Sequence, residues 1–162
     1  MSNTSYAELA QARRNWKDDH LSAYLRSAGA TGHIMDVTDI GGHKFTTMLL
    51  LQYVGRKSGK TMITPLIYGD LGGEVVIVAS KGGADHHPAW YLNVADSKEL
   101  AFQIATQAYR ATWREPQGSE RTRVWDFMVG VFPPYEAYQA STTRQIPLVM
   151  MSVLGPTDRF KE

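Results

Sequence analysis

The sequence predicts an α+β fold: a small, mostly antiparallel split β-barrel with an N-terminal helix and covering helices. About six short stretches rich in β-branched and aromatic residues are separated by turn-length gaps, which is typical of hairpins. Helical stretches precede, interrupt and follow them. Antiparallel strands in that number remove their exposed edges best by closing into a barrel. Side chains fill so small a barrel, so a cofactor must bind outside it, under the helices.

Length and composition narrow the classes of function. The 162 residues predict a single domain over 1–162, with a helix and connector over 1–44 and a barrel core over 45–154. The net charge of +1 argues against nucleic-acid binding. The lack of cysteine excludes disulfides, thiol catalysis and cysteine-based zinc sites. Neither a membrane-spanning apolar run nor a secretory leader is found, which predicts a cytoplasmic location.

A helix is expected over 6–28, where apolar side chains recur at helical spacing. The candidates for burial are Tyr6, Leu9, Leu21, Tyr24 and Leu25. Arg13, Arg14 and Lys17 form a polar side that includes Trp16, so weak peripheral contact with a membrane is an alternative to capping the barrel. Two aspartates follow directly and favour the capping role.

The other elements follow from alternation and turn residues. Strands are expected over 45–53, 62–68, 74–80, 100–104, 107–115 and 146–153. The run 69–73 joins the second and third strands as a hairpin. Short helices are expected over 88–95, with Pro88 in the first turn, and over 135–139. A longer helix over 119–132 opens with a Ser-Glu cap signal and buries Val124, Met128 and Val131.

The loop between the first two strands has the composition of an anion-binding site. It combines glycines, cations and a hydroxyl: Gly55, Arg56, Lys57, Ser58, Gly59 and Lys60. Glycines let backbone N–H groups converge, and an arginine fork matches phosphate oxygens. Two observations argue against a nucleotide-hydrolysing P-loop. Val54 stands where the first glycine is required, and a β-branched run with Pro65 follows instead of a helix.

Two further motifs accompany this loop. A buried strand runs through Val78, Ala79 and Ser80 into Lys81 and Gly82, and is followed by a stretch with Trp90, Tyr91 and Asn93. An aromatic segment holds Phe132, Tyr135 and Tyr138. Together, the three motifs over 49–153 resemble the deazaflavin-dependent nitroreductase family, the split-barrel reductases that use coenzyme F420.

The resemblance implies roles for individual residues. The 55–60 loop would hold the phosphate and acidic tail of F420, with Arg56 and Lys57 as cations. The other residues implied in cofactor binding are Pro65, Val78, Ala79, Ser80, Lys81, Gly82, Trp90, Tyr91 and Asn93. The residues implied in the substrate pocket are Ile67, Phe132, Tyr135 and Tyr138. The chain departs from some members at Met62, where a cation can stand, and at Ile67 and Phe132, which make the pocket more aliphatic; Lys60 can replace the missing cation.

The implied activity is hydride transfer from reduced F420 to flat, conjugated acceptors: quinones, enones or enoates, coumarin-like lactones and nitroaromatics. Ser80, Tyr135 or Tyr138 would then donate a hydrogen bond or proton to the acceptor oxygen. Three alternatives stay open: an FMN-binding oxidase or reductase, a non-catalytic module that binds a cofactor or lipid, and a nucleotide hydrolase. No metal is expected, because neighbouring His86 and His87 diverge and lack a third ligand.

Overall fold

The computed structural model describes residues 6–97 and 99–162, with side chains described from residue 16 onward. The helices are α1 (Tyr6–Arg26), α2 (Ala89–Ala95), α3 (Gly118–Val131) and α4 (Pro134–Ala140), with short 3-10 turns η1 (Thr38–Ile40) and η2 (Lys81–Gly83). The strands are β1 (Ile34–Met35), β2 (Thr46–Val54), β3 (Thr61–Leu71), β4 (Glu74–Val78), β5 (Glu99–Ile104), β6 (Gln107–Arg114) and β7 (Leu148–Thr157).

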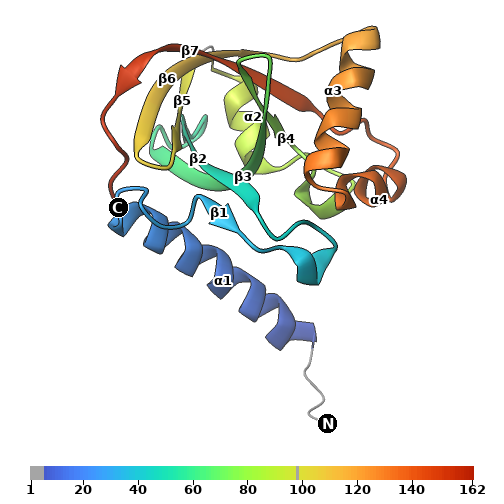
Figure 1. The fold of residues 1–162 in the computed structure, drawn as a ribbon, viewed down its shortest axis with the longest axis horizontal. Helices are drawn as coiled ribbons and strands as arrows, with labels where there is room; N and C mark the ends of the chain where they lie inside the picture. Colours follow the sequence, from blue (N-terminus) through green and yellow to red (C-terminus); the bar gives the residue numbers. More distant parts are fainter. Residues whose placement is uncertain (1–5, 98) are drawn as a thin grey trace.

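The strands form a closed antiparallel barrel (Figure 1). Their order is β1-β2-β3-β4-β7-β6-β5, and a further pairing between β2 and β5 closes the ring, with β1 added at the rim. Neighbours in sequence form the hairpins β2–β3, β3–β4 and β5–β6, which local alternation and turn residues specify. The predicted α+β barrel is therefore confirmed.

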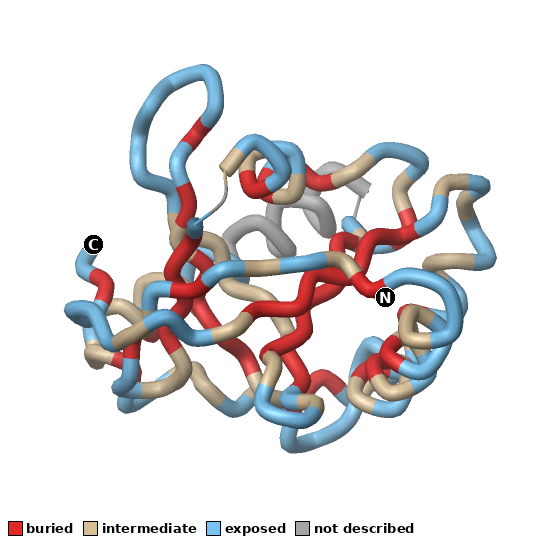
Figure 2. The backbone as a smooth tube through the Cα atoms, turned by 90° about the horizontal axis from the view of Figure 1, so that it is seen from above, coloured by how far each residue is buried: buried red, intermediate tan, exposed pale blue. Residues whose placement is uncertain are grey.

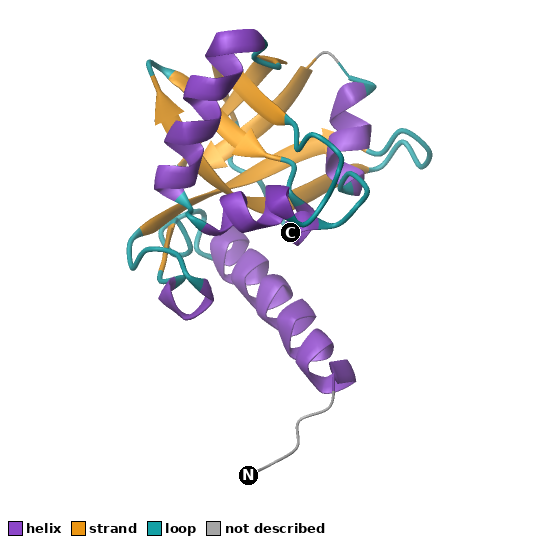
Figure 3. Cartoon of the chain, turned by 90° about the vertical axis from the view of Figure 1, so that its right-hand side faces the viewer, coloured by secondary structure: helices purple, strands orange, loops and turns teal. Residues whose placement is uncertain are grey.

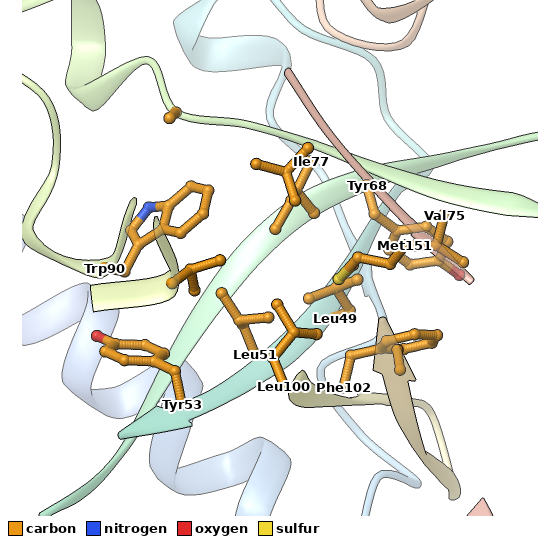
Figure 4. Close-up of a cluster of buried hydrophobic side chains, with 14 residues drawn as sticks. Leu49, Leu51, Tyr53, Tyr68, Val75, Ile77, Trp90, Leu100, Phe102 and Met151 are labelled. Atoms are coloured by element: carbon orange, nitrogen blue, oxygen red, sulfur yellow. The ribbon is translucent and has the colours of Figure 1, made fainter. Parts of the chain in front are cut away.

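The barrel interior is filled by alternate residues of its strands. Leu49 and Leu51 of β2, Ile77 of β4 and Met151 of β7 belong to one buried cluster. They alternate with outward-facing neighbours because successive side chains of a strand point to opposite faces. Trp90 of α2 packs into the same cluster beside Tyr53 and Leu51 (Figure 4). The interior therefore has no room for a cofactor, as the sequence predicted.

Helices cover the outside of the barrel (Figure 2 shows the buried strands beneath exposed loops). α3 and α4 pack together over one side, where Val124, Met128 and Tyr135 join outward-facing residues of β4 and β7. The C-terminal part of α1 covers β2 and β5 through Tyr24, while its N-terminal part projects away from the barrel (Figures 1 and 3). Among the helices described, none has the length and apolarity needed to cross a membrane.

The structure departs from the sequence predictions at element ends. β3 continues to Leu71, so its hairpin with β4 has the two-residue turn Gly72-Gly73 instead of the longer 69–73 loop. Helix α3 begins at Gly118 after an N-cap at Gln117, so Ser119 lies inside the helix and does not cap it. Pro88 is the N-cap of α2. The connector contains β1, which the sequence did not predict. Of the proposed α1 contacts, Tyr6, Leu9, Arg13 and Arg14 lie outside the described side chains.

Tyr24 anchors α1 to the barrel, and its hydroxyl should contribute measurably to the free energy of unfolding. The hydroxyl accepts a hydrogen bond from the Ala105 backbone N–H at 2.8 Å and lies 3.1 Å from the Met48 carbonyl oxygen. Tyr24→Phe leaves that part-buried N–H without its partner, so we expect the free energy of unfolding to fall by about 1–3 kcal/mol. Denaturant unfolding measures it, with Tyr109→Phe as control, because no hydrogen bond of the Tyr109 hydroxyl is found among described residues. Equal losses in both variants would contradict the anchoring role.

Candidate functional site

One edge of β3 leaves the barrel wall open. Residues Thr61 to Ile67 pair with β2, but β4 pairs only with Tyr68 to Leu71. No described strand pairs with the other edge of 61–67, which explains how Pro65, without an N–H, is accommodated there. Leu66 packs against the interior cluster and Ile67 against the outer ones, so Pro65 faces outward with Ile67. A flat ligand can therefore lie outside the barrel along this edge.

The 55–60 loop lies at the start of this open edge and is held in shape by its own bonds. Gly55 N–H donates to the Lys60 carbonyl at 2.8 Å, and Gly59 N–H donates to the Gly55 carbonyl at 2.8 Å. The Ser58 hydroxyl accepts from Lys60 N–H at 3.2 Å, so it serves the loop itself. Gly59 has a φ of +69°, which a residue with a Cβ rarely adopts. The loop is a preformed turn with its charged side chains exposed.

Asn93 joins this loop to α2. Its side-chain oxygen accepts from the Arg56 backbone N–H at 3.0 Å and from the Arg56 Nη1 at 2.9 Å. These two hydrogen bonds use only Nη1 of the guanidinium group. The other nitrogens of the group remain free to bind an anion. Asn93 therefore supports the candidate cofactor loop through Arg56, in addition to the wall position that the sequence suggested.

The cations around the groove are not neutralised by acids. Among the ion pairs of the described residues, none includes Arg56, Lys57, Lys60 or Lys81. The Lys81 ammonium instead lies 2.7 Å from His86 Nε2. Exposed cations that form no ion pair can bind an anionic group without first breaking an internal contact with an acid.

The turn after β4 follows two buried residues. Val78 is 5% exposed and Ala79 0%, so the structure leaves almost no surface of either residue for a ligand. The backbone of Ser80 has right-handed helical angles (φ −81°, ψ −37°), whereas Lys81 and Gly82 have positive φ values of +46° and +63°. On its other side the turn is held by Arg144, which donates to the Ser80 carbonyl at 2.7 Å. The sequence did not predict a role for Arg144.

The aromatic residues of α2 are placed differently from one another. Trp90 is 6% exposed and belongs mainly to the core, which leaves little of its ring for a cofactor. Tyr91 is half-buried, and its hydroxyl donates to Glu115 at 3.0 Å. Burial and that hydrogen bond raise the pKa of Tyr91 to about 12. The ring of His87 lies 4.9 Å from the ring of Tyr91.

The four residues proposed for the substrate pocket come together. Ile67 of β3 packs into the same cluster as Phe132, Tyr135 and Tyr138. The rings of Phe132 and Tyr135 lie 5.0 Å apart, and those of Tyr135 and Tyr138 lie 6.3 Å apart. Tyr135 is 4% exposed, and burial raises the pKa of its hydroxyl, so that the group stays protonated at neutral pH. Tyr138 is half-buried.

Helix α4 also touches the turn after β4. The Ser141 hydroxyl donates to the Gly83 carbonyl at 2.9 Å. A Cβ on Gly83 would lie 2.9 Å from the Tyr138 Cα, so the two backbones are in direct contact. The aromatic cluster and the Ser80–Gly82 turn are therefore neighbours, as the assigned roles of cofactor and substrate residues require.

The structure has open surface hollows away from these residues. A hollow of about 530 Å³ between α3 and the segment 139–145 includes Arg121, Trp125 and Arg144 in its lining, and another of about 200 Å³ borders β2 and β5. None of the sequence-predicted site residues lines either of them. No group of three or more metal-ligating side chains occurs in the described part of the chain.

These features define a split-barrel protein with an exposed cationic loop beside an unpaired strand edge. Residues 19–152 match the family model of F420H(2)-dependent quinone reductases, and the chain belongs to this family. An F420H(2)-dependent quinone reductase of Mycobacterium tuberculosis is 30% identical over 107 residues, which are 64% of this chain and 72% of that protein. A second M. tuberculosis protein classed with these reductases is 31% identical over 68% of this chain and 93% of its own.

Two solved structures are similar to this chain in both sequence and fold. The structure of an F420-H2 dependent reductase is 37% identical, has a TM-score of 0.60, and is covered over 93% of its chain and 65% of this one. A structure described as a domain-swapped dimer is 31% identical with a TM-score of 0.63, over 99% of its chain and 86% of this one.

The protein is therefore an F420-dependent reductase, and its cofactor is coenzyme F420 rather than FMN. The residues present fit this group. The exposed, unpaired cations of the 55–60 loop suit a phosphate and an acidic tail, and the open edge at Pro65 suits a flat ring. The predictions of family and cofactor are confirmed.

Proposed function

We propose that this protein reduces flat, conjugated acceptors, with quinones as the first choice, at the Ile67–Tyr138 cluster. The observation that carries this proposal is the meeting of Ile67 from the open β3 edge with Phe132, Tyr135 and Tyr138. Of the four, the half-buried Ile67 and Tyr138 offer the accessible surface, since Phe132 is 3% and Tyr135 4% exposed. An aliphatic and an aromatic wall suit planar apolar rings. The names of the relatives as quinone reductases support the same substrate class. Enones or enoates, coumarin-like lactones and nitroaromatics share that planarity and belong to the proposal as further acceptors.

When bound, reduced F420 supplies a hydride to the acceptor. The chain has to hold the acceptor flat along the β3 edge and meet the charge that develops on its oxygen. The 55–60 loop, the Ser80–Gly82 turn and Pro65 are proposed to hold the cofactor, with Trp90, Tyr91 and Asn93 as wall and support. A quinone that gains a hydride also needs a proton, for which Ser80, Tyr135 and Tyr138 are the candidate donors.

The direct test follows the return of oxidised F420 absorbance when reduced F420 is mixed with protein and a water-soluble quinone. Enone, coumarin and nitroaromatic acceptors run in parallel. Saturable turnover with the quinone supports the proposal. Tight F420 binding without turnover of any acceptor would instead establish a non-catalytic binding module. Phosphate release from ATP is the matching test for the hydrolase alternative.

The tyrosine pair should affect turnover more than cofactor binding. In the double variant Tyr135→Phe with Tyr138→Phe we expect kcat for the quinone to fall about 100-fold, the lower end of what a positioned proton donor contributes. F420 affinity should stay within about twofold, since the rings and their packing remain. Steady-state kinetics and a cofactor titration measure the two quantities, with Ser80→Ala alongside. Unchanged kcat in both the double variant and Ser80→Ala would assign the proton to solvent.

A further inference from the structure

Arg144 binds the turn after β4 through the backbone carbonyl groups of that turn. Its Nη2 donates to the Ser80 carbonyl at 2.7 Å and its Nε to the Ala84 carbonyl at 2.8 Å. Its Nη1 lies 3.2 Å from the Ala79 carbonyl oxygen and 3.0 Å from His87 Nδ1. The sheet register makes this contact possible, because Val78 at the end of β4 pairs with Leu148 at the start of β7, shortly after Arg144.

All three guanidinium nitrogens are therefore used inside the protein. Arginine can only donate, so His87 Nδ1 must accept, which requires a neutral imidazole. Burial and then the charge of Arg144 lower the pKa of His87, consistent with that state. None of the ion pairs among described residues includes Arg144. The side chain therefore serves as a clamp on carbonyl groups.

The clamp fixes where the N–H groups of the turn point. A trans peptide directs its C=O and the following N–H in opposite directions, and the described chain has no cis peptide. With the Ala79 and Ser80 carbonyls held against Arg144, the N–H groups of Ser80 and Lys81 point away from it. Neither group, nor Gly82 N–H, donates to any described residue. The right-handed Ser80 followed by positive φ at Lys81 is the backbone pattern of an anion-binding nest.

We propose that Arg144 is a positioning residue for the cofactor: it holds the carbonyls of Ala79, Ser80 and Ala84 so that the N–H groups of residues 80–82 face an oxygen of F420. This inference rests on the proposed placement of F420 at that turn. The oxygen belongs either to the phosphate or to the deazaflavin ring, since both offer a partly negative acceptor. Arg144 acts through the backbone and touches neither cofactor nor acceptor.

Arg144→Lys tests this role, because one ammonium group cannot replace three nitrogens in a planar fork. The matched control is Arg121→Lys: Arg121 is also half-buried and donates to a carbonyl, that of Ile146, at 2.9 Å, but makes no hydrogen bond to the turn. Tryptophan fluorescence titration with F420 should show affinity about tenfold weaker in Arg144→Lys. Arg121→Lys should stay within about twofold of the natural protein.

Hydrogen exchange of the unliganded protein gives a second readout. Gly83 and Ala84 N–H groups donate to the Ser80 and Lys81 carbonyls, so they should exchange faster when Arg144→Lys loosens the turn. Repeating the titration with a deazaflavin chromophore that lacks the phosphate identifies which oxygen of F420 the turn binds. An affinity loss for both ligands assigns the ring oxygen, and a loss for F420 alone assigns the phosphate.

Two results would overturn the inference while F420 still binds the natural protein. One is F420 affinity in Arg144→Lys that matches Arg121→Lys. The other is a loss of affinity with unchanged exchange at Gly83 and Ala84. Failure of the natural protein to bind F420 would instead overturn the proposed cofactor site itself, so the two failures are distinguishable.

Discussion

Removing both cations of the loop, Arg56→Ala with Lys57→Ala, should weaken F420 binding about 10–100-fold, the largest effect on affinity that we expect. Both side chains are exposed and form no ion pair among the described residues, and the Asn93 oxygen that accepts from Arg56 Nη1 keeps its bond to the Arg56 backbone N–H when the side chain is removed. A charge-assisted contact with an anion contributes about 1 kcal/mol at a solvated site, and two of them, about 2 kcal/mol, correspond to a loss within this range. Stability should change by less than about 0.5 kcal/mol.

The salt dependence of binding provides a sharper measurement. Exposed charges are screened within about 10 Å at 0.1 M salt, so F420 affinity of the natural protein should fall as salt rises, and less steeply in the double variant. The control Arg159→Ala with Lys161→Ala removes the same charge from the exposed C-terminal segment. Equal losses in the two double variants would mean that net charge, and not a contact at the loop, attracts the cofactor.

Much of the fold could be predicted from the sequence because it is built from local hairpins. Alternating strands and glycine-rich turns are encoded by neighbouring residues, so the hairpins β2–β3 and β5–β6 were predicted close to their observed bounds. The two-residue strand β1 was missed because so short a run has no period of its own. Closure of the ring depends on the pairing of β2 with β5, which are distant in sequence.

The candidate site divides in the same way. The 55–60 loop is a local motif, and its chemistry is legible from six consecutive residues. The resemblance predicted the cluster of Ile67 with Phe132, Tyr135 and Tyr138, which composition alone does not indicate. Arg144 was missed, because an arginine that binds three backbone carbonyls leaves no pattern of side-chain types. Only the register of β4 against β7 brings it to the turn.

The contact between α4 and the turn after β4 predicts the largest loss of stability. Gly83 has a φ of +84°, and a Cβ there would lie 2.9 Å from the Tyr138 Cα and 2.9 Å from the Tyr138 carbonyl oxygen. Backbone atoms cannot move aside as a flexible side chain can, so either α4 or the turn must shift. We expect Gly83→Ala to lower the free energy of unfolding by about 2–4 kcal/mol, from positive-φ strain together with overpacking.

The neighbouring glycine separates these two causes. Gly82 has a φ of +63° and no atom within 4 Å of an added Cβ, so Gly82→Ala should cost only the strain, about 1–2 kcal/mol. Denaturant unfolding of both variants measures the difference. If Gly83→Ala lowers the free energy of unfolding no more than Gly82→Ala does, the close contact between α4 and the turn does not contribute to the loss. A clear excess, accompanied by weaker F420 binding, would show that one backbone contact couples the aromatic helix to the turn proposed to hold the cofactor.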